Sequence, residues 1–240
     1  MKVELIDAMG TDASIVNAAR VSFGNNIINT ARLLDDNTRL PIALTDLPVG
    51  DRKLISFLMR NKHASPFEHC TLQFAIETTI AVSREAMRHR TFSFNEFSTR
   101  YSEISNDAGH ANWYIPDADH MRTQTGKPGS YFFTPITDVG TIVKAQDAMD
   151  YAYGIAYNTY TLLLRMGVAK EIARNVLPLG TTTTFYMSGN LRNWFNFLVL
   201  RNSPAALQEI RDIAERIEWT ISVVFPAAYA AWLESGRPQI

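Results

Sequence analysis

The strongest constraint on the fold is a change in the spacing of apolar residues between residues 70 and 82. Here Leu72, Phe74 and Ile76 alternate with polar residues, which is typical of a strand that buries one face. Over residues 138–166 the apolar residues instead recur at the spacing of a long helix. Helical and strand patterns do not alternate one for one along the chain. We therefore predict an α+β fold, in which helices flank a small, mostly antiparallel sheet.

Shorter patterns predict the other elements. We expect strands over residues 1–7 and 181–186, and helices over 11–23, from 51, over 168–175, over 188–200 and from 203. Residues 24–50 are rich in Asn, Asp and Pro and are expected to be irregular. Residues 101–135 contain several Gly and Pro and are expected to form a long loop. No Gly/Ser linker, long charge run or internal repeat divides the chain. The prediction is one domain over residues 1–240.

Composition and charge exclude several classes of protein. The chain has 240 residues, of which 46% are hydrophobic and 20% charged, and these values exclude intrinsic disorder. Lys and Arg number 23 and Asp and Glu 24, so the net charge of −1 argues against a nucleic-acid-binding protein. No apolar run approaches the roughly 18 residues that span a bilayer, and acidic residues lie where a signal peptide is apolar. We expect a soluble, cytoplasmic protein without a nucleic-acid or membrane partner.

The single cysteine and the 5 histidines limit the available chemistry. One cysteine cannot form an internal disulfide, and neither residue type has the spacing of a metal site, so we expect no metal. The sequence also lacks the glycine-rich patterns that hold nucleotide phosphates. Cys70 begins the alternating apolar stretch, which favours a buried structural thiol over a catalytic nucleophile.

The stretch from Arg84 to Tyr101 is rich in arginine and carries the most chemical information. Guanidinium groups form paired hydrogen bonds with phosphate oxygens, and the short polar side chains between them suit recognition of a base or a ribose. A solvated face laced with ion pairs is the alternative. However, Glu85 and Glu96 are the only acids in the stretch, too few to pair with its arginines. We interpret the stretch as a site for a phosphorylated ligand with a planar ring. The aromatic residues expected to anchor it in the core are Phe92, Phe94 and Phe97.

The same stretch contains the pattern R-H-R-x-x-S-x-N-E-x-S-x-R, formed by Arg88, His89, Arg90, Ser93, Asn95, Glu96, Ser98 and Arg100. With every fixed position matched, the chain resembles the flavin-dependent thymidylate synthases, of which this pattern is the signature. Other blocks similar to those of the family are Ala18–Phe23, His63–His69, Ala173–Pro178 and Asn190–Arg201. The resemblance therefore runs through most of the chain, although residues 106–133 match no block.

The resemblance implies a reaction, its cofactor and an assembly. Members of the family make dTMP from dUMP. They take the one-carbon unit from methylenetetrahydrofolate and reducing equivalents from NADPH through bound FAD, without a covalent enzyme nucleophile. The family fold is α+β and assembles as a homotetramer with sites shared between subunits. The activity implied for this chain is that of an FAD-dependent thymidylate synthase, a methyltransferase. A non-catalytic flavin- or nucleotide-binding homologue is the alternative.

The resemblance also implies roles for individual residues. Those at family positions that contact FAD are His63, Ser65, Arg88, His89, Arg90, Glu96, Asn190, Leu191, Arg192 and Asn196. Those at family positions that contact dUMP are Glu85, Arg88, Glu96, Phe97, Ser98, Thr99, Arg100, Arg174 and Arg201. Arg201 is the implied catalytic residue, because a guanidinium beside the uracil stabilises negative charge that develops on the ring. Glu85 departs from the family, since many members carry Gln there and an ionised carboxylate cannot donate a hydrogen bond.

Overall fold

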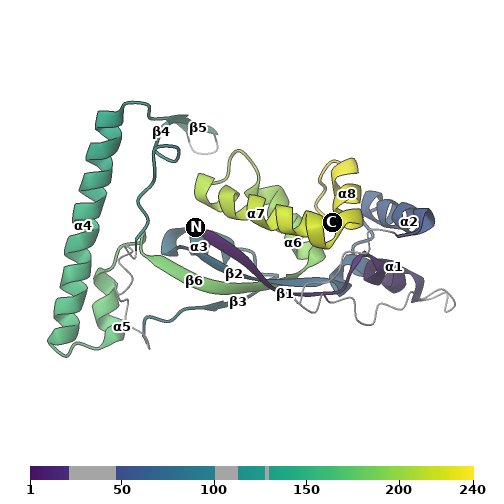
Figure 1. Cartoon of the computed structure of the whole chain (residues 1–240), viewed down its shortest axis with the longest axis horizontal. Coiled ribbons are helices and arrows are strands. Elements are labelled where there is room, and N and C mark those ends of the chain that lie inside the picture. Colours follow the sequence, from purple (N-terminus) through teal and green to yellow (C-terminus); the bar gives the residue numbers. More distant parts are fainter. Residues whose placement is uncertain (22–46, 101–112, 128–129) are drawn as a thin grey trace. The chain divides into compact units, whose positions relative to one another are not determined.

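The computed structural model describes residues 1–21, 47–100, 113–127 and 130–240 (Figure 1). The helices are α1 (Asp12–Arg20), α2 (Val49–Arg60), α3 (Ile80–Ala86), α4 (Val139–Arg165), α5 (Lys170–Ala173), α6 (Leu191–Arg201), α7 (Gln208–Val224) and α8 (Pro226–Glu234), with short 3-10 helices η2 (Ser65–His69) and η3 (Arg174–Val176). The strands are β1 (Lys2–Met9), β2 (Thr71–Thr79), β3 (Ser93–Glu96), β4 (Arg122–Lys127), β5 (Ser130–Pro135) and β6 (Thr182–Asn190). The irregular structure expected over most of 24–50 and the helix end expected at Phe23 lie outside the described residues.

The chain forms two compact units, each built from separate segments. Unit 1 comprises Met1–Ile76, Ala86–Asn95 and Phe185–Ile240, and unit 2 comprises Glu77–Glu85 and Glu96–Thr184. Each unit therefore uses stretches that are far apart in sequence, and no single boundary in the sequence separates them. One domain over residues 1–240 stays a prediction.

The main sheet has the strand order β1-β2-β6-β3. Two hydrogen bonds set the direction of its central pair: Leu191 N donates to Cys70 O at 2.8 Å, and Gln73 Nε2 donates to Ser188 Oγ at 2.9 Å. Residue numbers rise along β2 while they fall along β6, so this pair is antiparallel. Together with the flanking helices, the sheet confirms the predicted α+β class.

Aromatic packing holds the start of the Arg-rich stretch against helix α6 within unit 1. Trp194 on α6 lies 5.0 Å from the ring of Phe74 and 4.5 Å from that of Phe92. Gly189 makes the approach possible, because a Cβ there would lie 2.4 Å from a ring carbon of Phe92. The indole Nε1 of Trp194 donates to the Gly189 carbonyl at 3.0 Å. The predicted burial of Phe92 is confirmed, whereas Phe97 is 47% exposed and does not anchor the stretch in the core.

Buried polar groups connect the N-terminal part of unit 1 to helix α8 by hydrogen bonds. Asp12, the first residue of α1, accepts hydrogen bonds from the backbone N–H groups of Ala227 and Ala228 at the start of α8 (2.8 and 2.9 Å). Cys70 is fully buried beside it, and its burial raises the pKa of the thiol above its ordinary range. The prediction of a buried structural thiol is therefore confirmed.

The long loop expected over residues 101–135 is confirmed for residues 114–121, which form no helix or strand, but is wrong for residues 122–127 and 130–135. Strands β4 and β5 form an antiparallel hairpin in which Arg122 pairs with Pro135 and Lys127 with Ser130. Gly126 has a φ of +98°, and a Cβ there would lie 2.3 Å from the Ser130 carbonyl oxygen. The glycine interpreted as a break in regular structure thus belongs to strand β4 of an antiparallel pair. Residues 101–112 of the expected loop lie outside the described residues.

Three other predicted boundaries were displaced by local capping. β2 ends at Thr79 rather than Val82, because the Thr79 hydroxyl accepts from Val82 N (3.2 Å) and starts α3. β6 continues to Asn190, where the helix expected from residue 188 begins, since the Asn190 side chain accepts from Asn193 N (2.9 Å). The helix expected from Ser203 starts at Gln208, because the Ser203 hydroxyl closes a local turn with Ala205 N (3.3 Å).

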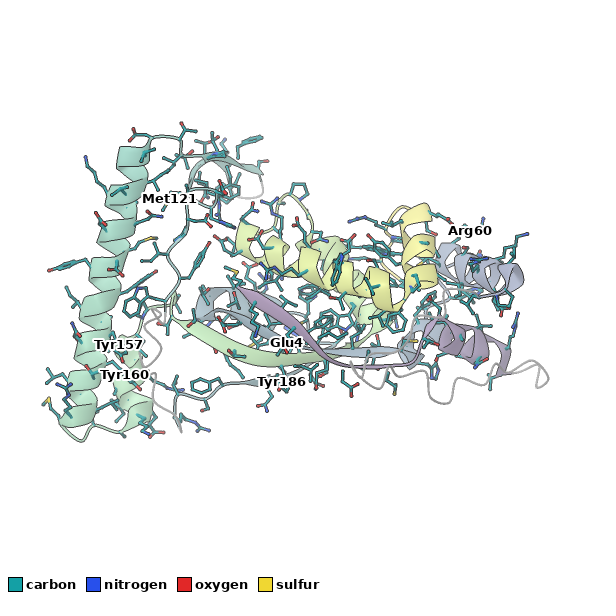
Figure 2. The ribbon with its side chains drawn as sticks, in the orientation of Figure 1. Glu4, Arg60, Met121, Tyr157, Tyr160 and Tyr186 are labelled. Atoms are coloured by element: carbon teal, nitrogen blue, oxygen red, sulfur yellow. The ribbon has the colours of Figure 1, made fainter. Side chains whose placement is uncertain are left out.

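Helix α4 follows the prediction over its length and is anchored in unit 2 by aromatic side chains. Its N-cap is Asp138, which accepts from Thr141 N at 2.8 Å. Tyr160 is fully buried, and its ring lies 6.3 Å from that of Tyr157 (Figure 2). Tyr157 in turn lies 6.0 Å from the ring of Trp113. These tyrosines therefore pack, as expected, while Tyr151 is exposed.

Candidate active site

The predicted site residues fall into two sets, one in each compact unit. The set in unit 2 is Glu85, Glu96, Phe97, Ser98, Thr99, Arg100 and Arg174. The set in unit 1 is His63, Ser65, Arg88, His89, Arg90, Asn190, Leu191, Arg192, Asn196 and Arg201. Most of the residues implied for dUMP lie in unit 2, and those implied for FAD, apart from Glu96, lie in unit 1.

A pocket of about 430 Å³ lies within unit 2, between α3, the end of β3, the α5–η3 segment and the start of β6. Its polar lining consists of Ser83, Arg84, Glu96, Thr99, Arg174, Asn175, Thr182 and Thr183. Cationic and anionic side chains thus share one cavity of a size that suits a small ligand. Glu96, Phe97, Thr99 and Arg174 are the members of the predicted dUMP set that line it.

Glu96 is held at the wall of this pocket by two hydroxyl groups. Its Oε1 accepts from Thr183 Oγ1 at 2.9 Å and from Ser83 Oγ at 3.4 Å. Ser83 and Thr183 are themselves buried. The carboxylate is therefore held by buried donors on α3 and β6 while the residue itself remains exposed.

Arg174 and Thr99 meet in the same pocket although they are far apart in the sequence. Arg174 Nη1 donates to Thr99 Oγ1 at 3.2 Å. The Phe97 amide donates to Thr184 O at 2.8 Å, which fixes the backbone just before Thr99 against β6. A guanidinium whose recorded partner is a hydroxyl keeps donors for a phosphate.

Three other residues of the predicted dUMP set lie close in sequence but do not line this pocket. Glu85 is half-buried on α3, and Arg100 is exposed. The amide of Arg100 donates to Ser98 Oγ at 3.4 Å, so the hydroxyl of Ser98 takes part in a local turn. Their roles toward dUMP stay predictions.

In unit 1, Arg201 and His89 form the central contact. Arg201 Nε donates to His89 Nε2 at 2.9 Å. A guanidinium can only donate, so Nε2 carries no proton and the imidazole is neutral, with its proton on Nδ1. Burial, and then the charges of Arg201 and Arg88, lower the pKa of His89 from 6.5 to about 4.

Two contacts keep the His89 segment against α6. The His89 ring lies 4.8 Å from that of Phe197, and Asn193 Nδ2 donates to Thr91 O at 2.8 Å. Arg88 and Arg90, on either side of His89, are exposed. The structure thus brings the Arg88–Arg90 segment and the C-terminal block together within one unit.

The other residues implied for FAD contact neighbouring parts of unit 1. Arg192 Nε and Asn196 Nδ2 both donate to Ile240 O (2.8 and 2.9 Å), and Asn196 Oδ1 accepts from Ile240 N (2.9 Å). Arg192 also forms an ion pair with Glu68 at 2.5 Å. These polar groups have protein partners, so their contacts with FAD stay predictions.

Three further members of the FAD set differ in their exposure. Leu191 is fully buried, and its amide donates to Cys70 O. His63 and Ser65 are exposed, and the His63 ring lies 5.8 Å from that of Phe57. Their roles toward FAD also stay predictions.

Five polar residues that line the pocket were not among the predicted site residues: Ser83, Arg84, Asn175, Thr182 and Thr183. Arg84 was visible as a member of the Arg-rich stretch, one turn before Arg88, but no motif distinguished it. Thr183 carried no signal, since it lies within a run of threonines whose register against β3 the sequence does not reveal.

Neither a metal cluster nor a membrane span is found in the part of the chain that the structure describes. Its residues include no group of three or more His, Cys, Asp or Glu that could hold a metal ion. None of its helices is both long and apolar enough to cross a bilayer.

Comparison with known proteins matches nearly the whole chain. Residues 4–227 match the family model described as thymidylate synthase complementing protein. The chain is 37% identical to the flavin-dependent thymidylate synthase of Tropheryma whipplei (strain TW08/27), over 98% of this chain and 93% of the relative. It is also 37% identical to a flavin-dependent thymidylate synthase of Thermus thermophilus, over 97% and 75% respectively. A crystal structure of the UMP/dUMP methylase PolB from Streptomyces cacaoi, bound with 5-Br dUMP, is similar with a TM-score of 0.82 and 35% identity, over 100% of this chain and 97% of that one.

Proposed function

The chain belongs to the family of flavin-dependent thymidylate synthases, and on that premise we propose that it converts dUMP to dTMP with a bound flavin. The observation that carries the proposal is the pocket of unit 2, where Arg174 and Glu96 line one cavity of about 430 Å³. A similar chain, PolB, binds 5-Br dUMP, which supports a uridylate as the ligand.

The pocket offers complementary groups for the two ends of dUMP. Arg174 donates to the phosphate, because its guanidinium is paired within the protein only through the Thr99 hydroxyl among the contacts that the structure describes. Glu96 accepts a hydrogen bond from an N–H or O–H group elsewhere on the nucleotide. Phe97, which is 47% exposed and lines the pocket, offers an apolar surface to the pyrimidine.

Arg201 is the proposed catalytic residue. Its guanidinium stabilises negative charge on the uracil ring. The ring carbon that accepts the one-carbon unit thereby becomes more nucleophilic, without a covalent enzyme nucleophile. The bond from Nε to the neutral His89 fixes the plane of the guanidinium. The buried Cys70 takes no part, since burial keeps its thiol protonated.

The Arg88–Arg90 segment of unit 1 fits the pyrophosphate of FAD. Arg88 and Arg90 are exposed cations on either side of His89, and guanidinium groups there can bind phosphate oxygens. Arg192 and Asn196 would hold the flavin once their bonds to Ile240 are exchanged. Bound FAD supplies the reducing equivalents for the methyl group. NADPH and methylenetetrahydrofolate are the proposed co-substrates, as the family resemblance implies.

A homotetramer with sites shared between subunits is part of the proposal. Helix α4 has 27 residues, yet Ile142 and Tyr160 are its only buried residues. Large apolar side chains exposed along it are Val139, Val143, Tyr151, Ile155 and Leu162, and Met166 directly follows its end. Burial of such a surface against other subunits supports the assembly. Size-exclusion chromatography with light scattering tests it, and a monomer with full activity would refute it.

Product formation and the visible spectrum test the proposed function. Purified protein supplied with FAD, dUMP, methylenetetrahydrofolate and NADPH should form dTMP, and Arg201→Ala should abolish that formation while the protein still folds. A yellow protein that binds dUMP but forms no dTMP would instead support the non-catalytic homologue. A protein that stays colourless with added FAD would refute the flavin-dependent reaction and favour a non-catalytic nucleotide-binding homologue.

A further inference from the structure

The hydroxyl of Thr183 faces the pocket of unit 2 and donates to Glu96. We propose that Thr183 is a positioning residue, which fixes the Glu96 carboxylate so that its other oxygen accepts a hydrogen bond from the nucleotide. The proposal rests on the proposed function, in which this pocket binds dUMP.

The geometry makes Thr183 the main donor to Glu96. The distance from Thr183 Oγ1 to Glu96 Oε1 is 2.9 Å, within the ordinary range for two oxygens. Ser83 Oγ is 3.4 Å from the same carboxylate oxygen but 3.0 Å from Ile80 O. A hydroxyl has one proton to donate, and the shorter distance favours the Ile80 carbonyl. Ser83 therefore contributes less to the position of Glu96 than Thr183 does.

Burial gives this bond its positioning effect. Thr183 is 7% exposed on β6, and a β-branched side chain in a strand has few rotamers. Glu96 is exposed, and its long side chain would otherwise sample many rotamers. Both recorded bonds reach Oε1, so Oε2 is the oxygen that these contacts leave for a ligand. Because the carboxylate is already fixed, ligand binding does not lose the conformational entropy of ordering that side chain, and the binding free energy is more favourable.

The fixed carboxylate also sets the direction in which the nucleotide lies. An ionised carboxylate accepts hydrogen bonds and repels a phosphate, whereas Arg84 and Arg174 in the same lining attract one. The phosphate is therefore held at the arginines. Glu96 receives an N–H or O–H donor from the uracil or the sugar.

The neighbouring Thr184 provides a matched control. It lies next to Thr183 on β6, it is exposed, and the pocket lining does not include it. Its recorded bond is made by its backbone carbonyl, which accepts from Phe97 N, so the strand pairing does not need its hydroxyl. Thr184→Val makes the same chemical change as Thr183→Val on the opposite face of the strand.

The test measures kcat and the KM for dUMP in the FAD-loaded enzyme. Thr183→Val should raise the KM for dUMP about tenfold, the loss of one hydrogen bond to a charged group. Thr183→Ser keeps the hydroxyl and should stay within about threefold of wild type, and Thr184→Val should match wild type. In a Glu96→Ala background, Thr183→Val should change the KM less than about twofold, because its effect passes through Glu96.

The outcomes separate the role of Thr183 from the proposed function. If the wild-type protein neither binds nor methylates dUMP, the proposed function is refuted, and the positioning role of Thr183 is refuted with it. Wild-type activity with an unchanged KM in Thr183→Val overturns only the role. The role is also overturned if Thr183→Ser is as impaired as Thr183→Val, or if the effect persists without Glu96, since a purely structural contribution would behave in that way.

Discussion

Replacing His89 with Phe removes the acceptor of the Arg201 Nε bond while keeping an aromatic ring. The bond is 2.9 Å long and joins a charged donor to a neutral imidazole. A hydrogen bond with a charged partner contributes about 1.5–3 kcal/mol, and each 1.4 kcal/mol corresponds to a factor of about ten. If Arg201 stabilises charge on the uracil, His89→Phe should lower kcat/KM for dUMP roughly 10- to 100-fold.

The control is His89→Gln, whose side-chain oxygen can accept from Arg201 Nε in place of the imidazole. It should retain most of the activity. Phe in turn preserves the packing on Phe197, at 4.8 Å in the wild type, so the melting temperature of His89→Phe should change little. Because His89 is also a proposed flavin contact, activity is normalised to bound flavin from its visible absorbance. Full activity in His89→Phe, or equal losses in both variants, would refute this account.

The same imidazole predicts a pH dependence of stability. The pKa of His89 in the folded protein is about 4, below its ordinary 6.5, because burial and the neighbouring arginines disfavour its charged form. As pH falls from 6.5 to 4, the unfolded chain binds a proton that the folded chain does not, so stability falls in this window. The free energies of unfolding of wild type and His89→Phe should therefore coincide above a pH of about 6.5 and diverge as the pH falls toward about 4, where wild type becomes the less stable. Parallel profiles would contradict the assignment of a neutral imidazole.

Three further predictions concern residues outside the His89 contact. Arg84→Ala should raise the KM for dUMP by about three- to tenfold, and more at low salt, because it removes an exposed cation from the pocket. The comparable change Arg60→Ala, on α2, should leave the KM unaltered. Asp12→Asn should make the free energy of unfolding, measured by denaturant unfolding, less dependent on pH between about 4 and about 6. Burial raises the pKa of Asp12 from 3.8 to about 6, so wild-type stability falls as pH rises through that window, by up to about 3 kcal/mol. Gly189→Ala should destabilise unit 1 by about 1–3 kcal/mol in denaturant unfolding, because its Cβ would overlap Phe92, and an unchanged midpoint would contradict this.

Apolar spacing was a sufficient guide where one period persisted over many residues. It predicted β1, the body of β2 and the whole of α4. It failed where a single side chain decided the boundary, since the cap formed by Thr79 turns a strand into a helix without any change in apolar content. The β4–β5 pair was missed for a related reason. A stretch that contains Gly and Pro gives the same sequence signal whether it forms an irregular loop or connects two paired strands.

The motif identified the segments on which the candidate site residues lie, but it did not show which of them meet. Arg174 and Thr99 come together because η3 and the end of the Arg-rich stretch face one pocket. Thr183 has no counterpart in the motif. Its contact with Glu96 depends on the register of β6 beside β3. Hydrophobic alternation indicates which face of the strand a side chain lies on, but it does not indicate which residue of the neighbouring strand lies opposite.

The partners of each arginine indicate what that arginine can still bind. Arg192 is paired with the carboxylate of Glu68, so its charge is already offset within unit 1. Arg174 has a hydroxyl as its partner, and Arg84 has no carboxylate partner among the residues that the structure describes. An arginine without a carboxylate retains its full charge and most of its donors, and a phosphate can supply the missing counter-charge. Arg84 and Arg174 are therefore the stronger candidates for the nucleotide phosphate, although the motif blocks omit Arg84, whereas Arg192 is a residue that the resemblance implies for FAD.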